Sequence, residues 1–281
     1  MTGIRIAALY RYPLKSARGE SLSSARLVVT GIEHDREWLI VDRNGLFQTQ
    51  RVLPQLATLQ VTLSGERWQL DAPGQPALSL ARAFDGEPCR VRIWNDECQA
   101  VDAGTAAAGW LSRWLGGDYR LVRFADGTRR TSSREWTGDI AAPNQFTDGF
   151  PLLVLGRASL DDLAARAGRH FPVERFRPNL LLDGLAPYEE DRIETLVIGG
   201  VQLRLVKPCT RCVITTTDQA RGERDGEEPL RTLRTYRHDR ALKGVVLAQN
   251  AVIASGVGAT LKVGDACDAH YRAQGSDPVA Q

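Results

Sequence analysis

The chain has 281 residues, of which 43% are hydrophobic and 25% are charged. Because a domain usually holds about 100–200 residues, this length predicts two domains that can bury their cores without disulfides or structural metals. The 26 glycines and 13 prolines are ordinary for a globular protein, which excludes disordered, collagen-like and disulfide-scaffold classes. A formal net charge of +2 gives no reason to expect binding to nucleic acid or to an anionic membrane.

Hydropathy and cysteine content indicate the compartment. No apolar run approaches the ~18–20 residues of a membrane span, and the first residues lack the hydrophobic region of a signal peptide. We therefore expect a cytoplasmic protein without a membrane-embedded part. The five cysteines are an odd set, so reduced thiols or a metal site are expected rather than structural disulfides.

The first part of the chain predicts a meandering antiparallel sheet or a small barrel. Short β-type runs are separated by turns, and Arg43-Asn44-Gly45 is a hairpin signal. The expected strands are residues 4–10, 24–29, 37–42, 56–63, 68–70, 90–94 and 97–102. Between residues 103 and 115, one face is apolar (Ala106, Leu111, Trp114 and Leu115), which predicts the first helix. A domain boundary is expected near Gly116-Gly117.

The rest of the chain is also expected to be rich in strands, at residues 119–124, 152–155, 180–182, 192–198, 201–206, 213–216 and 245–254. The polar stretch 125–149 predicts a long connection, and loops of that length are usually functional or mobile. Ser159 is expected to cap a helix that runs through Arg166. Two helices among many strands predict an α+β fold that is mainly β, and residues 273–281 are expected to form a disordered tail.

Cys209 and Cys212 are the one cysteine pair with chemically suggestive spacing, and they precede the strand expected at 213–216. Lys207 and Arg211 flank the pair. Nearby cations lower the pKa of a thiol and favour the thiolate, which is the form that binds metal or acts as a nucleophile. This segment is therefore the candidate site.

Spacing alone leaves three interpretations of the pair. A structural zinc site needs about four ligands, but the other cysteines are isolated and the histidines lack ligand spacing (His34, His170, His238 and His270). A thioredoxin-like dithiol would lie between a strand and a helix, whereas β-branched residues follow Cys212. The third interpretation is two unreactive thiols in a turn before a strand.

The residues around the pair resemble the signature of the MOSC domain, which is named from the carboxy-terminal domain of molybdenum cofactor sulfurase. The similarity extends from Lys207 to Thr217, and then through Asp218, Gly222 and Glu228-Pro229-Leu230-Arg231-Thr232-Leu233. Other motifs are similar to the amino-terminal β-barrel domain that accompanies MOSC in the mitochondrial amidoxime-reducing component and its bacterial relatives. They are Tyr12-Pro13-Leu14-Lys15-Ser16, Asp35-Arg36-Glu37-Trp38-Leu39 and Gln48-Thr49-Gln50-Arg51.

The resemblance implies an N-terminal β-barrel-like domain at residues 1–118, followed by a MOSC β-barrel domain with a few helices at 119–272. It also implies a molybdenum cofactor, a molybdopterin-bound molybdenum, with Cys212 as the metal ligand and catalytic residue and Cys209 as a neighbour. A soft thiolate suits such a metal centre. Carried over by position, the cofactor-binding residues are Lys15, Ser16, Arg36, Asp148, Gly149, Arg177, Asn179 and Thr210.

Two positions depart from the family's pattern. Thr210 stands where the mitochondrial relatives have serine, and this exchange keeps the hydroxyl group. Gly149-Phe150 replaces small hydroxyl residues, so backbone N–H groups would have to substitute for side-chain hydrogen bonds there.

The implied activity is the two-electron reduction of N-hydroxylated compounds such as amidoximes and hydroxylamines. Because the sequence has no recognisable motif for flavin, haem or an iron–sulfur cluster, electrons are expected from a separate ferredoxin-like or flavoprotein reductase. The alternative is a molybdenum cofactor-binding or sulfur-carrier protein that holds a persulfide on Cys209 or Cys212. Against this alternative, the chain has no pyridoxal-phosphate desulfurase domain.

Overall fold

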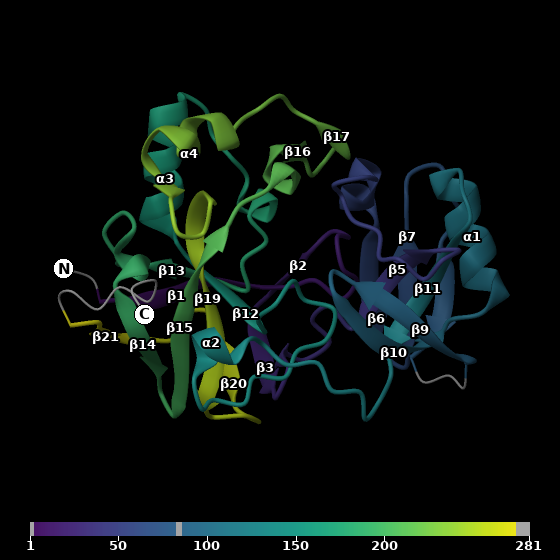
Figure 1. The fold of residues 1–281 in the computed structure, drawn as a ribbon, viewed down its shortest axis with the longest axis horizontal. Helices are drawn as coiled ribbons and strands as arrows, with labels where there is room; N and C mark the ends of the chain where they lie inside the picture. Colours follow the sequence, from purple (N-terminus) through teal and green to yellow (C-terminus); the bar gives the residue numbers. More distant parts are fainter. Residues whose placement is uncertain (1–2, 83–85, 274–281) are drawn as a thin grey trace.

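Two bodies of β-structure lie side by side in the chain, whose computed structural model describes residues 3–82 and 86–273 (Figure 1). One body is built around a large sheet, and the other around a smaller sheet with helix α1 (Thr105–Leu115) at its far side. Strands predominate, so the expected mainly β, α+β fold is confirmed. None of the described helices is long and apolar enough to cross a membrane.

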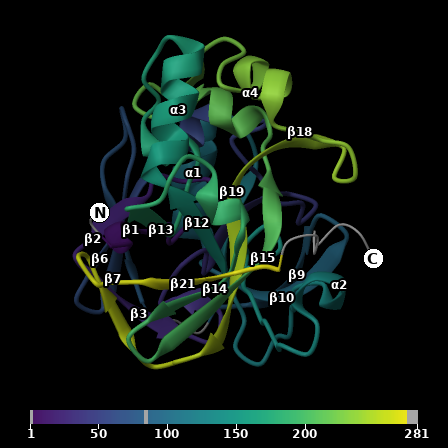
Figure 2. The same ribbon diagram turned by 90° about the vertical axis from the view of Figure 1, so that its left-hand side faces the viewer.

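The large sheet is buried on both faces. Its described strands, in spatial order, are β2 (Glu20–Leu22), β1 (Arg5–Arg11), β13 (Leu180–Asp183), β12 (Leu152–Gly156), β19 (Gly244–Ser255), β15 (Val201–Thr210), β14 (Ile193–Ile198) and β21 (Asp268–Tyr271), and β18 (His238–Asp239) pairs with β19. In β12, Leu152 and Val154 enter one core, whereas Leu153 and Leu155 enter the other. Helices α3 (Arg157–Ala167) and α4 (Leu230–Tyr236) contribute to the second core (Figure 2). A continuous apolar run therefore forms a strand with two buried faces.

The smaller sheet is also buried on both faces. Its order is β5 (Trp38–Asp42), β11 (Tyr119–Phe124), β10 (Asp96–Asp102) and β9 (Pro88–Ile93). In β5, Trp38 and Ile40 pack towards α1 and the meander of β6 (Gln60–Ser64), β7 (Arg67–Asp71) and β8 (Leu78–Ala81). Leu39 and Val41 enter a separate core that also holds Phe146. Phe146 thus anchors the connection at 125–149 to this sheet.

Strand pairing crosses the predicted division at residue 118 in both directions. From the first part of the chain, β1 pairs with β13, and β3 (Ser24–Val28) pairs with β20 (Thr260–Lys262) as well as β4 (Gly31–Ile32). Beyond residue 118, β11 pairs with β5 and β10. The division into domains stays a prediction, and the tail expected at 273–281 falls outside the described residues except for residue 273.

The strand expected at 56–63 is wrong in its first half. A 3₁₀ helix, η1 (Pro54–Thr58), precedes β6 there. Pro54 fixes a helical φ at the start of this turn, and the hydroxyl of Thr58 donates to the carbonyl of Gln55 at 2.9 Å. These local contacts take the place of strand pairing.

The strand expected at 213–216 is wrong throughout, because the segment forms the 3₁₀ helix η4 (Val213–Thr216). The hydroxyl of Thr215 donates to the carbonyl of Cys212 at 2.9 Å, and that of Thr216 to the carbonyl of Val213 at 2.8 Å. β-Branched residues usually favour strands, but here their hydroxyl groups bond to the preceding turn.

The expectation of two helices is also wrong, since the described residues contain four α-helices. The two unexpected ones are α2 (Arg134–Thr137), inside the long connection, and α4. Both have fewer than the ~12 residues that an isolated helix needs to be stable in water, so tertiary packing must stabilise them. Helix α3 begins before Ser159, whose hydroxyl donates to buried Glu190 at 2.7 Å instead of capping the helix.

Two glycines with a left-handed backbone test how closely this segment packs on η1. One lies in the turn between β16 (Thr217–Asp218) and β17 (Glu223–Arg224), and the other follows β17. Gly222 has a φ of +68°, and a Cβ there would lie 2.8 Å from Cα of Gln55; Gly226 has a φ of +70° with no atom within 4 Å of a Cβ. We expect Gly226→Ala to lower the free energy of unfolding by about 1 kcal/mol through backbone strain. Gly222→Ala should lower it by about 2–4 kcal/mol, because a backbone clash adds to the strain. Urea unfolding compares the two, and equal losses would contradict the close approach.

Candidate functional site

One pocket is lined by every residue that the sequence predicted for the site. Its open space is about 860 Å³, and both bodies of the protein contribute to its walls. The predicted residues in its lining are Lys15, Ser16, Arg36, Asp148, Gly149, Arg177, Asn179, Thr210 and Cys212. Their convergence is a property of the fold, and their roles towards a cofactor stay a prediction.

Chain segments next to strand ends carry these residues. β12 and β13 are parallel neighbours, so the loops that precede them meet at one edge of the large sheet. Asp148 and Gly149 lie in the loop before β12, and Arg177 lies in the loop before β13. Cys212 follows β15, the strand whose last residue is Thr210. Leu153 of β12 and Lys207 of β15 both pair with Asn250 of β19, so the pocket extends from these loops along the sheet to the end of β15.

Two arginines of the pocket stack on one buried ring. Cζ of Arg36 lies 4.3 Å and Cζ of Arg177 lies 4.2 Å from the ring centre of Tyr12, which is fully buried. Arg36 also forms an ion pair with Asp35 and donates to the carbonyl of Arg177 at 3.2 Å. Burial, together with repulsion from Arg36, lowers the pKa of Arg177 to about 10. Arg177 therefore remains protonated near neutral pH.

Three of the predicted residues have a left-handed backbone. Their φ angles are 65° at Ser16, 51° at Arg36 and 56° at Arg177. Such conformations cost a residue other than glycine about 1–3 kcal/mol, and they concentrate at functional sites. The surrounding packing must offset this strain to hold the cationic side chains in place.

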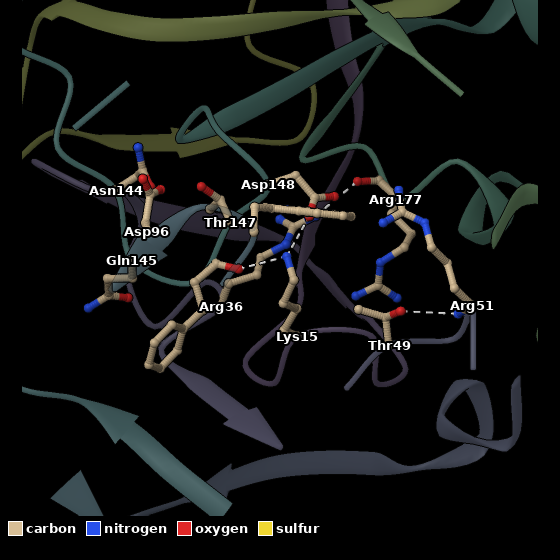
Figure 3. A network of polar contacts seen from close by, with 12 residues as sticks. Lys15, Arg36, Thr49, Arg51, Asp96, Asn144, Gln145, Thr147, Asp148 and Arg177 are labelled. Carbon is tan, nitrogen blue, oxygen red and sulfur yellow. Dashed lines mark hydrogen bonds and ion pairs between the residues drawn. The ribbon is translucent and has the colours of Figure 1, made fainter. Parts of the chain in front are cut away.

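Lys15 is the buried polar centre of the pocket (Figure 3). Its Nζ donates to the carbonyl of Phe146 at 2.9 Å and to Oδ1 of Asp148 at 2.6 Å. Burial lowers the pKa of Lys15, although attraction to Asp148 opposes the shift. Desolvation acts to raise the pKa of Asp148, but the charge and hydrogen bond of Lys15 outweigh it and hold that pKa below its ordinary range. Asp148 is therefore ionised at neutral pH.

Arg130 organises the loop that carries Asp148. Its side chain is 6% exposed, and Nη1 donates to the carbonyls of Gln145 and Thr147 at 2.9 and 2.8 Å. Its Nε forms an ion pair with Asp96 of β10 at 2.8 Å. A single arginine thus fixes the loop to the smaller sheet, and Figure 3 shows its partners Asp96, Gln145 and Thr147.

The side chain of Asn179 is occupied by protein contacts. Its Oδ1 accepts hydrogen bonds from Arg36 and from the backbone N–H of Leu153, both at 3.1 Å, and its Nδ2 donates to the carbonyl of Tyr10 at 3.2 Å. Asn179 is 1% exposed. The arrangement indicates that Asn179 orients Arg36 and joins β1 to β12.

Both thiols line the pocket, but cations do not dominate the environment of Cys209. Nη1 of Arg211 lies 2.9 Å from Sγ of Cys209, yet burial raises the pKa of this thiol more than Arg211 lowers it. Lys207 stacks on Trp136, with Nζ 4.5 Å from the ring centre. The expectation that flanking cations favour the thiolate is therefore wrong for Cys209.

Several lining residues were not assigned to the site from the sequence: Thr49, Arg51, Thr147, Arg211 and Asn250. Arg51 belongs to a motif quoted for the resemblance, and Arg211 was noted only as a cation beside the cysteines. The motif position of Arg51 was a usable signal. Thr147 and Asn250 had no comparable signal, because only tertiary folding brings them to the pocket.

The pocket has the chemistry of a site for a large anion. Among the described residues, five cations line it (Lys15, Arg36, Arg51, Arg177 and Arg211) and Asp148 is the single carboxylate. Nη2 of Arg177, Nε of Arg211 and Oγ1 of Thr147 are buried without a hydrogen-bond partner, and buried polar groups are normally paired. A phosphate-bearing ligand that offers many acceptors would satisfy them.

A metal at this site would need ligands from outside the protein. In the part of the chain that the structure describes, no group of three or more His, Cys, Asp and Glu side chains is placed to hold a metal ion. A ligand that supplies sulfur atoms to a soft metal would leave one position for a thiolate such as that of Cys212. The residues therefore fit an anionic cofactor that brings its own metal ligands.

Fold and site together define a mainly β protein with a preformed anion pocket beside a pair of thiols. The MOSC N-terminal beta barrel domain matches residues 3–118, and the MOSC domain matches residues 141–268. The mitochondrial amidoxime-reducing component 1 of Mus musculus is 34% identical over 92% of this chain and 80% of its own length. Component 1 of Homo sapiens is 32% identical over 92% and 81%, and component 2 of Bos taurus is 32% identical over 83% and 72%. The chain belongs to the family of MOSC-domain proteins with an N-terminal MOSC β-barrel domain.

The contacts of Asn179 predict a large effect on stability. Asn179→Ala leaves the N–H of Leu153 and the carbonyl of Tyr10 without these partners, so we expect it to lower the free energy of unfolding by about 2–4 kcal/mol. Thr210→Ala, at an exposed pocket residue, should change it by less than about 0.5 kcal/mol. Urea unfolding measures both variants. A similar small change in the two would contradict the positioning role of Asn179.

Proposed function

We propose that this protein is a molybdenum-cofactor-dependent reductase of N-hydroxylated compounds. The observation that carries the proposal is the pocket in which surplus cations, unpaired buried donors and Cys212 meet. The similarity to mitochondrial amidoxime-reducing components over most of the chain supports the reaction class.

Different residues of the pocket would bind different parts of the cofactor. Arg36 and Arg177 would neutralise its phosphate, because guanidinium groups bind phosphate oxygens in a two-pronged manner. Ser16, Thr210 and the backbone of Gly149 would meet the hydrogen-bonding edge of the pterin. Asn179 would act through Arg36 rather than on the cofactor. When bound, the cofactor supplies a metal that exchanges two electrons and accepts an oxygen atom.

Cys212 is the proposed protein ligand of the metal. It lies between the last residue of β15 and η4, and the hydroxyl of Thr215 donates to its carbonyl, so its backbone is fixed. A fixed thiolate can hold a metal in one orientation towards the open side of the pocket. Cys209, which is held by Arg211, would remain a neighbour of the site.

The overall reaction consumes two electrons and two protons, and it releases the substrate oxygen as water. We propose that the electrons come from a separate protein of the ferredoxin-like or flavoprotein reductase class. Both the donor and the substrate would have to approach the metal held by Cys212, which lines the pocket.

Metal and pterin content test the proposal. Protein made in a host that synthesises the cofactor should contain about one molybdenum and one pterin per chain by elemental mass spectrometry and pterin fluorescence. It should reduce benzamidoxime with an artificial electron donor. Cys212→Ser should reduce turnover at least about 100-fold, the loss typical when a group at the reacting centre is removed. Cys209→Ala serves as the matched control and should retain most of the turnover.

The outcomes separate the competing functions. Equal loss of activity in the two cysteine variants would favour the sulfur-carrier alternative, in which either thiol holds a persulfide. Protein that contains neither molybdenum nor pterin, although the host supplies both, would contradict the proposal.

A further inference from the structure

Arg51 stands at the rim of the pocket on a rigid backbone. Its N–H donates to Oγ1 of Thr49 at 3.2 Å, and its carbonyl accepts a hydrogen bond from Nη2 of Arg224 at 3.0 Å. The same Arg224 donates to the carbonyls of Gln50 and Val213 at 2.6 and 2.9 Å. Arg224 therefore ties the loop that carries Arg51 to the segment that follows Cys212.

An exposed tryptophan supports the guanidinium group of Arg51. Its Cζ lies 4.3 Å from the ring centre of Trp94, and Nε1 of Trp94 donates to Oδ1 of Asp148 at 3.2 Å. Trp94 occupies the tight turn between β9 and β10 with a φ of 54°, a conformation that usually takes Asn, Asp or Gly. A strained turn thus presents the indole ring to Arg51, and Phe47 packs on its edge at 4.7 Å.

The charge of Arg51 is only partly compensated within the described chain: it acts on Asp148 without direct contact and helps to lower the pKa of that carboxyl. Its guanidinium group forms no hydrogen bond or ion pair with the residues that the structure describes, in contrast to Arg36 and Arg177, which bond to backbone carbonyls. The lining carboxylate, Asp148, already accepts hydrogen bonds from Lys15 and Trp94. An anionic group at the mouth would therefore find five free donors in a fixed plane.

The position of Arg51 separates it from the inner cations. Arg36 and Arg177 stack on a fully buried tyrosine, whereas Arg51 stacks on Trp94, which is 39% exposed, and precedes Val52, which is 71% exposed. A cofactor phosphate would be neutralised at the inner arginines. What reaches Arg51 is the part of a bound molecule that points towards solvent.

We propose that Arg51 binds a carboxylate of the substrate, so that the protein prefers N-hydroxylated compounds that carry a carboxylate remote from the N–OH group. This inference rests on the proposed function and adds a substrate class to it. A carboxylate matches the planar fork of an arginine in two-pronged geometry, and stacking on Trp94 holds the plane of that fork. Because Trp94 is 39% exposed, a group bound at Arg51 stays close to solvent.

The test compares two substrates that differ only in the charged group, benzamidoxime and 4-carboxybenzamidoxime. For the unmodified, cofactor-loaded protein, we expect kcat/KM to be roughly 10- to 100-fold higher for the carboxylate, the range of a charge-assisted hydrogen bond. Arg51→Gln should abolish this preference, mainly through KM for the carboxylate, and Arg51→Lys should restore part of it. Arg221→Gln is the matched control: it removes a 72% exposed arginine outside the pocket lining and should keep the preference.

A binding measurement separates this inference from the proposed function. Calorimetry of benzamidine and 4-carboxybenzamidine with the loaded protein should show the same preference and the same loss in Arg51→Gln, whether or not turnover occurs. If neither amidoxime is reduced, the proposed function fails. The calorimetry of the two benzamidines still tests whether Arg51 binds the carboxylate. An unaltered preference in Arg51→Gln overturns the inference. So does a loss of molybdenum and pterin in that variant, because Arg51 would then serve the cofactor.

Discussion

The structure around the pocket depends on keeping several cations close together in a partly buried space. Two arginines share the ring of Tyr12, and Lys15 is nearly fully buried beside them. Removing charges from water is costly unless partners compensate them. Asp35 pairs with Arg36 and Asp148 with Lys15, but the lining still carries more positive than negative charge. The site is therefore most stable with an anion bound.

The two bodies of the protein are joined through this site. Lys15 reaches the loop of Asp148, and Arg130 fixes that loop to β10 of the smaller sheet. On the opposite rim, Arg224 connects the loop of Arg51 to the segment after Cys212. Because each link is a hydrogen bond to backbone or a close ion pair, the walls of the pocket are fixed before a ligand arrives, and pre-organisation reduces the cost of binding.

Much of this arrangement could be predicted from the sequence. The apolar run of β12 predicts a strand buried on both faces. The motifs around Lys15 and Cys212, together with the positions carried over from the resemblance, pointed to residues that line one pocket. The errors arise where tertiary contacts overrule local preference. The threonines after Cys212 bond to the preceding carbonyls and form a 3₁₀ turn, and burial outweighs Arg211 at Cys209.

Arg51 marks the limit of what the sequence could provide. It lies in a motif, yet its significance depends on Trp94, which comes from a different hairpin and carries an unusual backbone conformation. Nothing local in the sequence relates the two residues. The same holds for Arg130, whose four polar contacts bring β10 and the loop of Asp148 together.

The central claim is that surplus positive charge in the pocket is balanced by an anionic cofactor. The most direct measurement is calorimetric unfolding of the chain purified from hosts with and without cofactor synthesis, at low and at high salt. The account predicts a higher Tm for the loaded protein, and a cofactor-free protein that gains stability as salt screens its cations. Equal Tm values for the two preparations, with no salt dependence of the cofactor-free form, would contradict it.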